Sequence, residues 1–188
     1  ENEGISIHYE DNISLIPKDI DLVVYTPAVP RTHSELTYFI DNDFLVLKRA
    51  AVLGLISKAK KVIGIAGTHG KTTCTSMISW LLSHDKLNLP TSLIGGIDYG
   101  FMSNLQTGSS DLMIVEADES DKTFLSLPSK ISIITNIDDD HLEKFGTIEA
   151  LTEDFLKFAN NVGQEGNLIV CKNDPIISSI LNKFICKN

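Results

Sequence analysis

The sequence predicts an α/β fold with a mostly parallel, doubly wound sheet. Short apolar runs alternate with amphipathic helical patterns, one run leads into a glycine-rich turn, and two later runs end in polar residues. The runs expected to form strands are residues 5–8, 22–26, 44–47, 62–66, 92–94, 112–115, 131–135 and 168–171. With 43% hydrophobic residues among 188, the chain can build a real core.

Three helices are expected after these strands. The first follows the glycine-rich turn and is expected to pack one apolar face on the sheet: Cys74, Met77, Ile78, Leu81 and Leu82. The second is capped by Thr147, with the stripe Ile148, Leu151, Phe155 and Phe158. The third opens at Asp174-Pro175 and has the stripe Ile177, Ile180, Leu181, Phe184 and Ile185.

Two parts are expected along the chain. Residues 1–48 carry βαβ-like material without a glycine-rich loop, and residues 49–188 contain the turn and the later strands. The chain starts at an expected strand and stops on an expected helix. We therefore expect it to be part of a larger protein.

Composition excludes several classes of function. A net charge of −9 leaves no basic stripe for nucleic acid. Three cysteines without CxxC spacing argue against a metal cluster or a disulfide framework, and Cys74 is expected to be a small core residue. Because no signal peptide and no apolar run long enough for membrane insertion are present, a cytoplasmic protein is predicted.

The glycine-rich turn, residues 67–73, has the features of a phosphate-binding loop. Gly67 and Gly70 let backbone N–H groups face an anion, and the following helix presents its free amides. Lys71 adds a positive charge and Thr72 a hydroxyl for Mg²⁺. The general P-loop spacing would require glycine where the chain has Ile65. An ordinary strand-to-helix turn is the alternative, which the Lys-Thr-Thr sequence disfavours.

Acidic residues follow the run 112–115. Glu116 ends it and is expected to face the loop, because ligands gather at the carboxyl ends of parallel strands. Glu116 is therefore a candidate Mg²⁺ ligand. Asp118, Glu119 and Asp121 follow, and some of these carboxylates are expected to be solvated.

Two histidines lie near these acids or in the loop. His141 follows the run 131–135 and is expected at the same edge of the sheet. A histidine binds metal only when neutral, so activity should fall below about pH 6.5. His69, inside the loop, either fills the turn or contacts phosphates, and the spacing does not decide between the two.

Taken together, residues 67–73, 116–121 and 135–141 resemble motifs of the Mur ligases, the ATP-dependent enzymes that assemble the peptidoglycan stem peptide. In having histidine in this loop, the chain resembles the family branch that adds L-alanine to UDP-N-acetylmuramate more than the other branches. The resemblance implies a P-loop-type ATP-binding central domain at 49–188. It also implies that residues 1–48 are the last part of a Rossmann-like domain that binds the UDP-linked substrate. The family's C-terminal domain is absent, so the piece alone is expected to be inactive.

The resemblance also implies a mechanism in which ATP phosphorylates the muramic acid carboxylate and the amine of L-alanine attacks the acyl phosphate. ATP would be bound by Gly67, Thr68, His69, Gly70, Lys71, Thr72 and Thr73. Thr72 and Glu116 would hold a first Mg²⁺, and His141 would help to bind a second metal ion. Lys71 and His141 would be the catalytic residues, because positive charges offset the repulsion between a carboxylate and a phosphate.

Two alternatives stay open. A murein tripeptide recycling ligase shares the histidine-containing loop but adds a whole peptide to UDP-N-acetylmuramate. A non-catalytic nucleotide-binding module would bind ATP without acyl-phosphate chemistry, and it would give His141 no role. The sequence does not indicate an oligomeric state.

Overall fold

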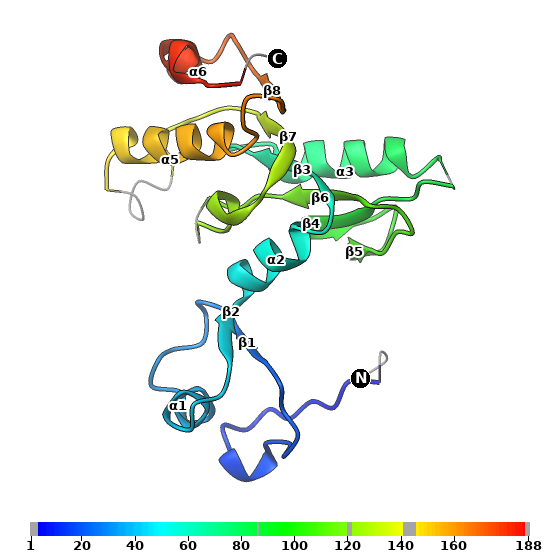
Figure 1. Cartoon of the computed structure of the whole chain (residues 1–188), viewed down its shortest axis with the longest axis vertical. Coiled ribbons are helices and arrows are strands. Elements are labelled where there is room, and N and C mark those ends of the chain that lie inside the picture. The colour runs from blue at the N-terminus through cyan, green and yellow to red at the C-terminus, as the bar shows by residue number, and fades with distance from the viewer. Residues whose placement is uncertain (1–3, 86, 120–121, 141–145, 187–188) are drawn as a thin grey trace. The chain divides into compact units, whose positions relative to one another are not determined.

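The computed structural model describes residues 4–85, 87–119, 122–140 and 146–186 (Figure 1). The chain divides into two compact units, Glu1–Val52 and Leu53–Asn188. Helix α2 (Arg49–Ser57) carries the chain from the first unit into the second. No helix in the described ranges combines the length and the apolar character that crossing a membrane requires.

The first unit is built on two short parallel strands, β1 (Val23–Tyr25) and β2 (Val46–Lys48), joined by helix α1 (Ser34–Asp41). Helix α1 buries Leu36 and Phe39. The ring of Phe39 meets that of Phe44 edge-on at 5.3 Å, which closes a small aromatic core. A 3₁₀ turn, η1 (Ile13–Leu15), precedes the strands.

The strand expected at residues 5–8 is wrong. These residues are irregular, and Ile5 and Ile7 are exposed. Apolar alternation predicts a strand only where a neighbouring strand and a core accept it, and the described part of this unit offers neither to residues 5–8. The following coil is held instead by Asp11, which accepts hydrogen bonds from Ser34 Oγ (2.5 Å) and Ser34 N (3.0 Å) at the start of α1. These bonds hold the pKa of Asp11 below its ordinary value.

The second unit is a six-stranded sheet in the order β5-β4-β6-β3-β7-β8. Its strands are β3 (Lys61–Ala66), β4 (Thr91–Asp98), β5 (Ser103–Gln106), β6 (Leu112–Glu116), β7 (Ser129–Ile134) and β8 (Asn167–Val170). All neighbours are parallel except β5, which pairs antiparallel with β4. The predicted doubly wound α/β fold is confirmed, and β5 is a strand that the sequence did not reveal.

Two apolar layers cover the two faces of this sheet. Along β3, Val62 and Ala66 belong to the larger core cluster, whereas Ile63 and Ile65 belong to the smaller one. Side chains of a strand alternate between faces, so the two clusters lie on opposite sides. Helix α5 (Ile148–Asn160) packs in the larger cluster and helix α3 (Lys71–Leu82) in the smaller (Figure 1).

Helix α5 follows its predicted pattern. Leu151, Phe155 and Phe158 are fully buried, and the side chain of Thr147 caps the helix by accepting from Ala150 N. Helix α6 (Pro175–Ile180) is likewise capped by Asp174 and buries Ile177 and Ile180. It ends in the 3₁₀ turn η3 (Leu181–Lys183), a break that leaves Ile185 of the predicted stripe exposed.

Helix α3 departs from its predicted pattern. Cys74 and Ile78 pack on the sheet, but Met77 and Leu81 are 59% and 61% exposed. The residues that are fully buried are Thr75 and Ser79. The helix is therefore rotated about its axis relative to the predicted apolar face, because two small hydroxyl residues allow a closer approach to the sheet than larger side chains would.

Candidate functional site

The glycine-rich turn joins β3 to α3 with two residues in left-handed backbone conformations. Gly67 has φ 141° and Gly70 has φ 79°. A Cβ atom at Gly67 would collide with the Thr135 hydroxyl, so glycine is required there for packing as well as for conformation. Gly70 is the N-cap of α3 and provides no side-chain hydrogen bond to the helix amides. These amides and the positive end of the helix dipole are what a phosphate needs.

The turn is fixed to the end of β7 by a set of hydrogen bonds. His69 N donates to Asn136 Oδ1 (2.9 Å), and Asn136 Nδ2 donates to His69 O (3.0 Å). Thr135 Oγ1 also donates to His69 O, at 2.6 Å. The Thr68 hydroxyl is turned the same way and accepts from Asp138 N at 2.9 Å. These hydrogen bonds define the shape of the turn, and Thr68 contributes to that shape.

The ring of His69 faces acidic residues. Its Nε2 lies 3.1 Å from Asp140 Oδ2 and 3.8 Å from Asp138 Oδ2, and the side chain is 54% exposed. The ring therefore lies over the carboxylates that follow β7 and does not fill the inside of the turn. Whether it contacts phosphates stays a prediction.

Lys71, the first residue of α3, reaches back over the turn. Its Nζ donates to Gly67 O (2.6 Å), Thr68 O (3.2 Å) and Glu119 Oε1 (2.9 Å). The side chains of Lys71 and Glu119 are only 15% and 4% exposed. Glu119 is therefore not one of the solvated carboxylates after β6, because it is buried as the partner of Lys71.

Thr72 and Glu116 meet beside this turn. Thr72 Oγ1 donates to Glu116 Oε1 at 2.8 Å, and Gly95 N donates to Glu116 Oε2 at 2.6 Å. A Cβ atom on Gly95 would collide with the Glu116 carboxylate. Because Gly95 on β4 has no side chain, Glu116 at the end of β6 can lie against the start of α3.

This pair fits a magnesium ion in its chemistry. Mg²⁺ prefers hard oxygen ligands and uses one or two protein groups, completing its shell with water and substrate phosphates. One carboxylate and one hydroxyl beside the predicted phosphate-binding turn provide that kind of donor set. In the parts of the chain that the structure describes, no group of three or more His, Cys, Asp or Glu side chains is arranged to hold a metal ion.

The remaining predicted site residues divide into two groups. Thr73 is exposed in the first turn of α3. His141 lies outside the described residues, as do Ser120 and Asp121 of the acidic segment. The structure therefore brings Lys71, Thr72 and Glu116 together with the turn, and the position of His141 stays a prediction.

Sequence reasoning missed two contributors. They are Glu119, which the sequence pattern does not distinguish from Asp118 and Asp121, and Gly95. For Glu119 no local signal was available, because its burial depends on Lys71, which is distant in sequence. For Gly95 the Gly95-Gly96 pair inside an apolar strand was a usable signal, since such glycines mark close approach of another group.

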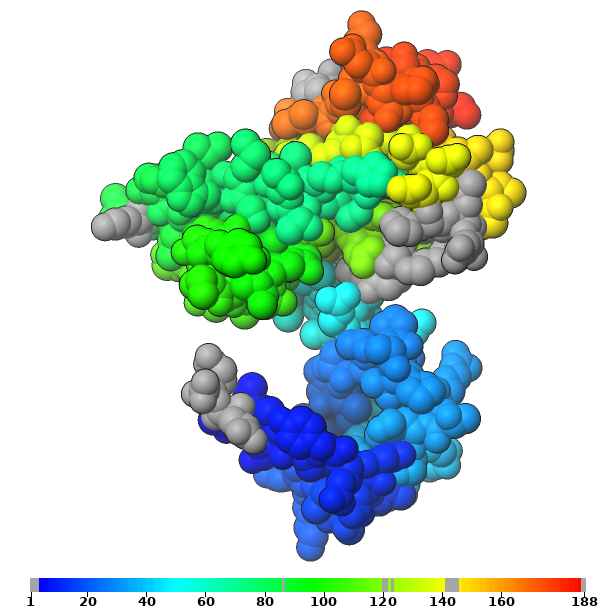
Figure 2. Space-filling model, turned by 180° about the vertical axis from the view of Figure 1, so that it is seen from behind, coloured from blue at the N-terminus to red at the C-terminus, as the bar shows by residue number. Residues whose placement is uncertain are grey.

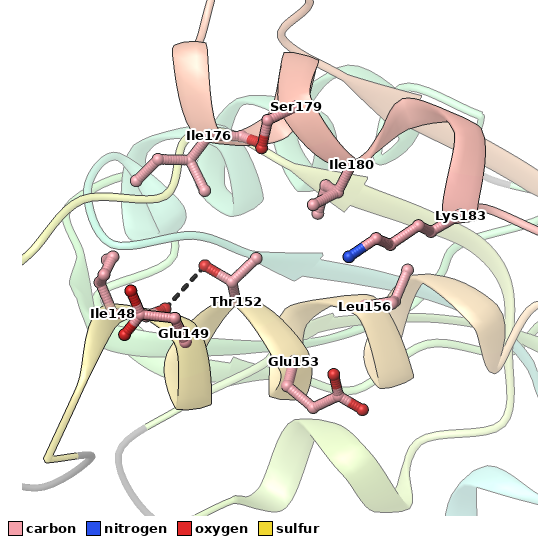
Figure 3. Close-up of a pocket in the computed structure, with 9 residues that line it drawn as sticks. All are labelled: Ile148, Glu149, Thr152, Glu153, Leu156, Ile176, Ser179, Ile180 and Lys183. Carbon is pink, nitrogen blue, oxygen red and sulfur yellow. Dashed lines mark hydrogen bonds between the residues drawn. The ribbon is translucent and has the colours of Figure 1, made fainter.

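Two of the hollows in the described part of the second unit lie away from the turn. One, of 380 Å³, is lined by α5, α6 and η3, with Glu149, Glu153 and Lys183 among its residues (Figure 3). The other, of 440 Å³, lies between the outer side of α3 and the β4–β5 connection, which are neighbours on the face seen in Figure 2. Neither is lined by Lys71, Thr72 or Glu116, so neither is the predicted site.

Comparison with protein families gives a match over most of the second unit. Residues 65–188 match the family model described as "Mur ligase middle domain". A protein of Parabacteroides distasonis named "UDP-N-acetylmuramate--L-alanine ligase" is 46% identical over 176 residues, which are 90% of this chain and 38% of that protein. A protein of the same name from Flavobacterium johnsoniae is 42% identical over 92% of this chain and 39% of its own length. The chain thus spans less than half the length of these relatives.

Solved structures show the same fold. The UDP-N-acetylmuramate-alanine ligase MurC of Thermotoga maritima has a TM-score of 0.81 at 27% identity, covering 95% of this chain and 41% of that one. A murein peptide ligase from Psychrobacter arcticus has a TM-score of 0.82 at 22% identity, covering 98% of this chain and 43% of that one. At that identity the second likeness concerns the fold alone.

Proposed function

Because the chain belongs to the Mur ligase family, we propose that it is the nucleotide-binding part of a ligase that joins L-alanine to UDP-N-acetylmuramate with ATP. The observation that carries this proposal is the meeting of Lys71, Thr72 and Glu116 beside the glycine-rich turn. The two relatives at 46% and 42% identity, both named as L-alanine ligases, support the choice of substrates. Such water-soluble substrates fit a cytoplasmic enzyme.

Each residue has a role in this proposal. The amides of the turn and of the first turn of α3 bind the ATP phosphates, and Gly67, Thr68, His69, Gly70 and Thr73 belong to this segment. Lys71 holds the terminal phosphates and offsets charge as the substrate carboxylate approaches. Thr72 and Glu116 would hold Mg²⁺, and His141 would help to hold a second metal ion. These metal ions would neutralise phosphate charge when bound.

The first unit would belong to a different binding function. We assign it to the end of the domain that binds the UDP-linked substrate. The structural boundary between Val52 and Leu53 lies close to the division drawn from the sequence at residues 48 and 49.

Ligation by the intact protein is the direct test. With ATP, Mg²⁺, UDP-N-acetylmuramate and L-alanine, phosphate release should require every substrate. Phosphate release that does not depend on UDP-N-acetylmuramate would contradict the proposal, and so would the absence of any phosphate release. Replacing L-alanine by the tripeptide identifies the amine: faster turnover with the tripeptide would favour the recycling ligase.

His141 separates a ligase from a module that only binds nucleotide. His141→Ala should reduce phosphate release by at least about a hundredfold if His141 helps to position metal and carboxylate. If the protein only binds nucleotide, this substitution should leave nucleotide binding unchanged. The wild-type protein should then show no substrate-dependent phosphate release. His84→Ala is a suitable control, because it removes another exposed histidine whose ring contacts Trp80 and not a predicted site residue.

A further inference from the structure

The ammonium group of Lys71 already uses its full hydrogen-bonding capacity. An ammonium donates three hydrogen bonds, and three oxygens accept from Nζ: Gly67 O, Thr68 O and Glu119 Oε1. A phosphate oxygen that binds Lys71 must therefore take over an N–H from one of these acceptors.

The three acceptors differ in charge and in attachment. The oxygens of Gly67 and Thr68 are neutral carbonyls of the turn that would hold the phosphates. Glu119 is a carboxylate from the segment after β6, and only 3% of the residue is exposed. A triphosphate has the same sign of charge as Glu119, so its arrival repels that group and not the carbonyls. Glu119 is thus the acceptor that an incoming phosphate would displace.

The Glu119 carboxylate depends on Lys71 in return. Its Oε1 accepts from Lys71, whereas Oε2 is buried without a hydrogen-bond partner among the described residues. A buried carboxylate that loses its remaining partner is strongly destabilising. The two side chains therefore stabilise each other in this arrangement.

We propose that Glu119 is a positioning residue, which orders Lys71 before nucleotide binds and releases it to the phosphates when nucleotide binds. Lysine is long and flexible, so an ordered starting position reduces the entropy lost when phosphate is bound. The same contact opposes binding, because its charge competes with the phosphates. This inference rests on the proposed function, since it requires a nucleotide at the turn.

The affinity for nucleotide tests whether phosphate replaces Glu119 as a partner of Lys71. The probe is a non-hydrolysable ATP analogue with Mg²⁺, titrated calorimetrically into the intact protein. Glu119→Gln keeps an acceptor for Lys71 but removes the competing charge, so Kd should fall about three- to tenfold. Glu165→Gln, at an exposed position before β8, removes the same charge elsewhere and should leave Kd within about twofold. An unchanged or higher Kd for Glu119→Gln would overturn the proposal.

Thermal unfolding without nucleotide tests the pairing. In the wild-type background, Glu119→Gln weakens a charged hydrogen bond and should lower Tm by roughly 2–4 °C. In a Lys71→Met background the carboxylate is buried without its partner, so the same substitution should raise Tm. This reversal of sign is the expected result. A change of the same sign in both backgrounds would overturn the pairing.

The two tests also separate this inference from the proposed function. If the wild-type protein binds the analogue and Glu119→Gln does not tighten it, the exchange is wrong and the nucleotide site stands. If the wild-type protein does not bind the analogue at all, the proposed function fails and the exchange fails with it.

Discussion

Helices α5 and α3 cover opposite faces of one sheet, yet they contact it in different ways. Helix α5 buries three large apolar side chains completely, and Phe158 stacks on Phe124 with ring centroids 5.4 Å apart. Helix α3 buries only the small side chains Thr75 and Ser79 completely and packs Cys74 and Ile78 partly on the sheet. It leaves Met77, Trp80 and Leu81 exposed. Helix α5 thus packs on the sheet through large buried apolar side chains, and α3 packs on it through smaller side chains.

The difference relates to what each helix does. Burial of apolar surface is the main stabilising contribution to a fold, and α5 provides much of it on its face. Helix α3 has its first residues, Lys71 and Thr72, in the predicted phosphate site. Its close contact places these residues at the strand ends. Substitutions in α5 should therefore affect stability, and those at the start of α3 should affect nucleotide chemistry.

The largest effect is expected from Phe158→Ala. The side chain is fully buried and also fills the space left by Gly64, so truncation creates a cavity in the larger core. The free energy of unfolding should fall by about 3–5 kcal/mol, measured by urea denaturation of the intact protein. A loss below about 1 kcal/mol would mean that α5 is not the main anchor of its face.

Thr72→Val should have the opposite profile. Valine keeps the shape of threonine but cannot bind a cation or donate to Glu116. Ligation should slow by about 10- to 100-fold, while the unfolding free energy changes by less than about 1 kcal/mol, since Thr72 is exposed. Steady-state phosphate release and denaturation measure the two quantities. A large stability loss with normal turnover would break the division of roles.

Asp154 gives α5 a pH-dependent contribution. Burial alone would raise its pKa, but hydrogen bonds from Lys122 (3.0 Å) and Lys157 (3.1 Å) outweigh burial and hold the pKa below the ordinary value of 3.8. A depressed carboxylate pKa contributes stability that is present above the unfolded pKa and is lost as pH falls through the folded one.

Asp154→Asn should therefore cost about 1 kcal/mol at pH 7. Unfolding curves of both proteins should converge as the pH falls below 3.8. Glu153→Gln, at the neighbouring exposed position, is the control and should show no such convergence. A constant difference between wild type and Asp154→Asn at every pH would argue that charge is not involved.

The smallest effect is expected from Trp80→Ala. Trp80 is 55% exposed on the outer side of α3, so its truncation leaves no cavity in the core. The unfolding free energy should change by no more than about 0.5 kcal/mol. A loss comparable with that of Phe158→Ala would show that the outer side of α3 packs against something in the intact protein.

Sequence patterns predicted the parts of the fold that depend on local periodicity. Apolar runs located the parallel strands, and the stripe and cap of α5 were read correctly from Thr147 to Phe158. The face of α3 was predicted only in part. Cys74 and Ile78 pack on the sheet as expected, but the fully buried residues are Thr75 and Ser79, which a pattern of apolar side chains does not count. Strand β5 is short and polar, and it is held by pairing with β4, a non-local effect.

The site was predictable to a similar extent. Lys71 and Thr72 follow from the glycine-rich turn and Glu116 from the end of its strand, and the structure brings the three side chains together there, while their roles stay a prediction. The contribution of Glu119 depends on burial, and that of Gly95 on the room left for a carboxylate from another strand. Such properties arise only when distant segments pack, so a linear pattern does not contain them.

The position of β3 has a consequence for how the protein is made. Ile63 is paired with Ile114 on one side and with Ile131 on the other, so the central strand has both neighbours later in the chain. The bond from His69 N to Asn136 closes a separation of 67 residues. Contacts of such long range form slowly. During synthesis, the predicted phosphate-binding turn can therefore reach its final conformation only after β7 and Asn136 have left the ribosome, although the residues of the turn emerge much earlier.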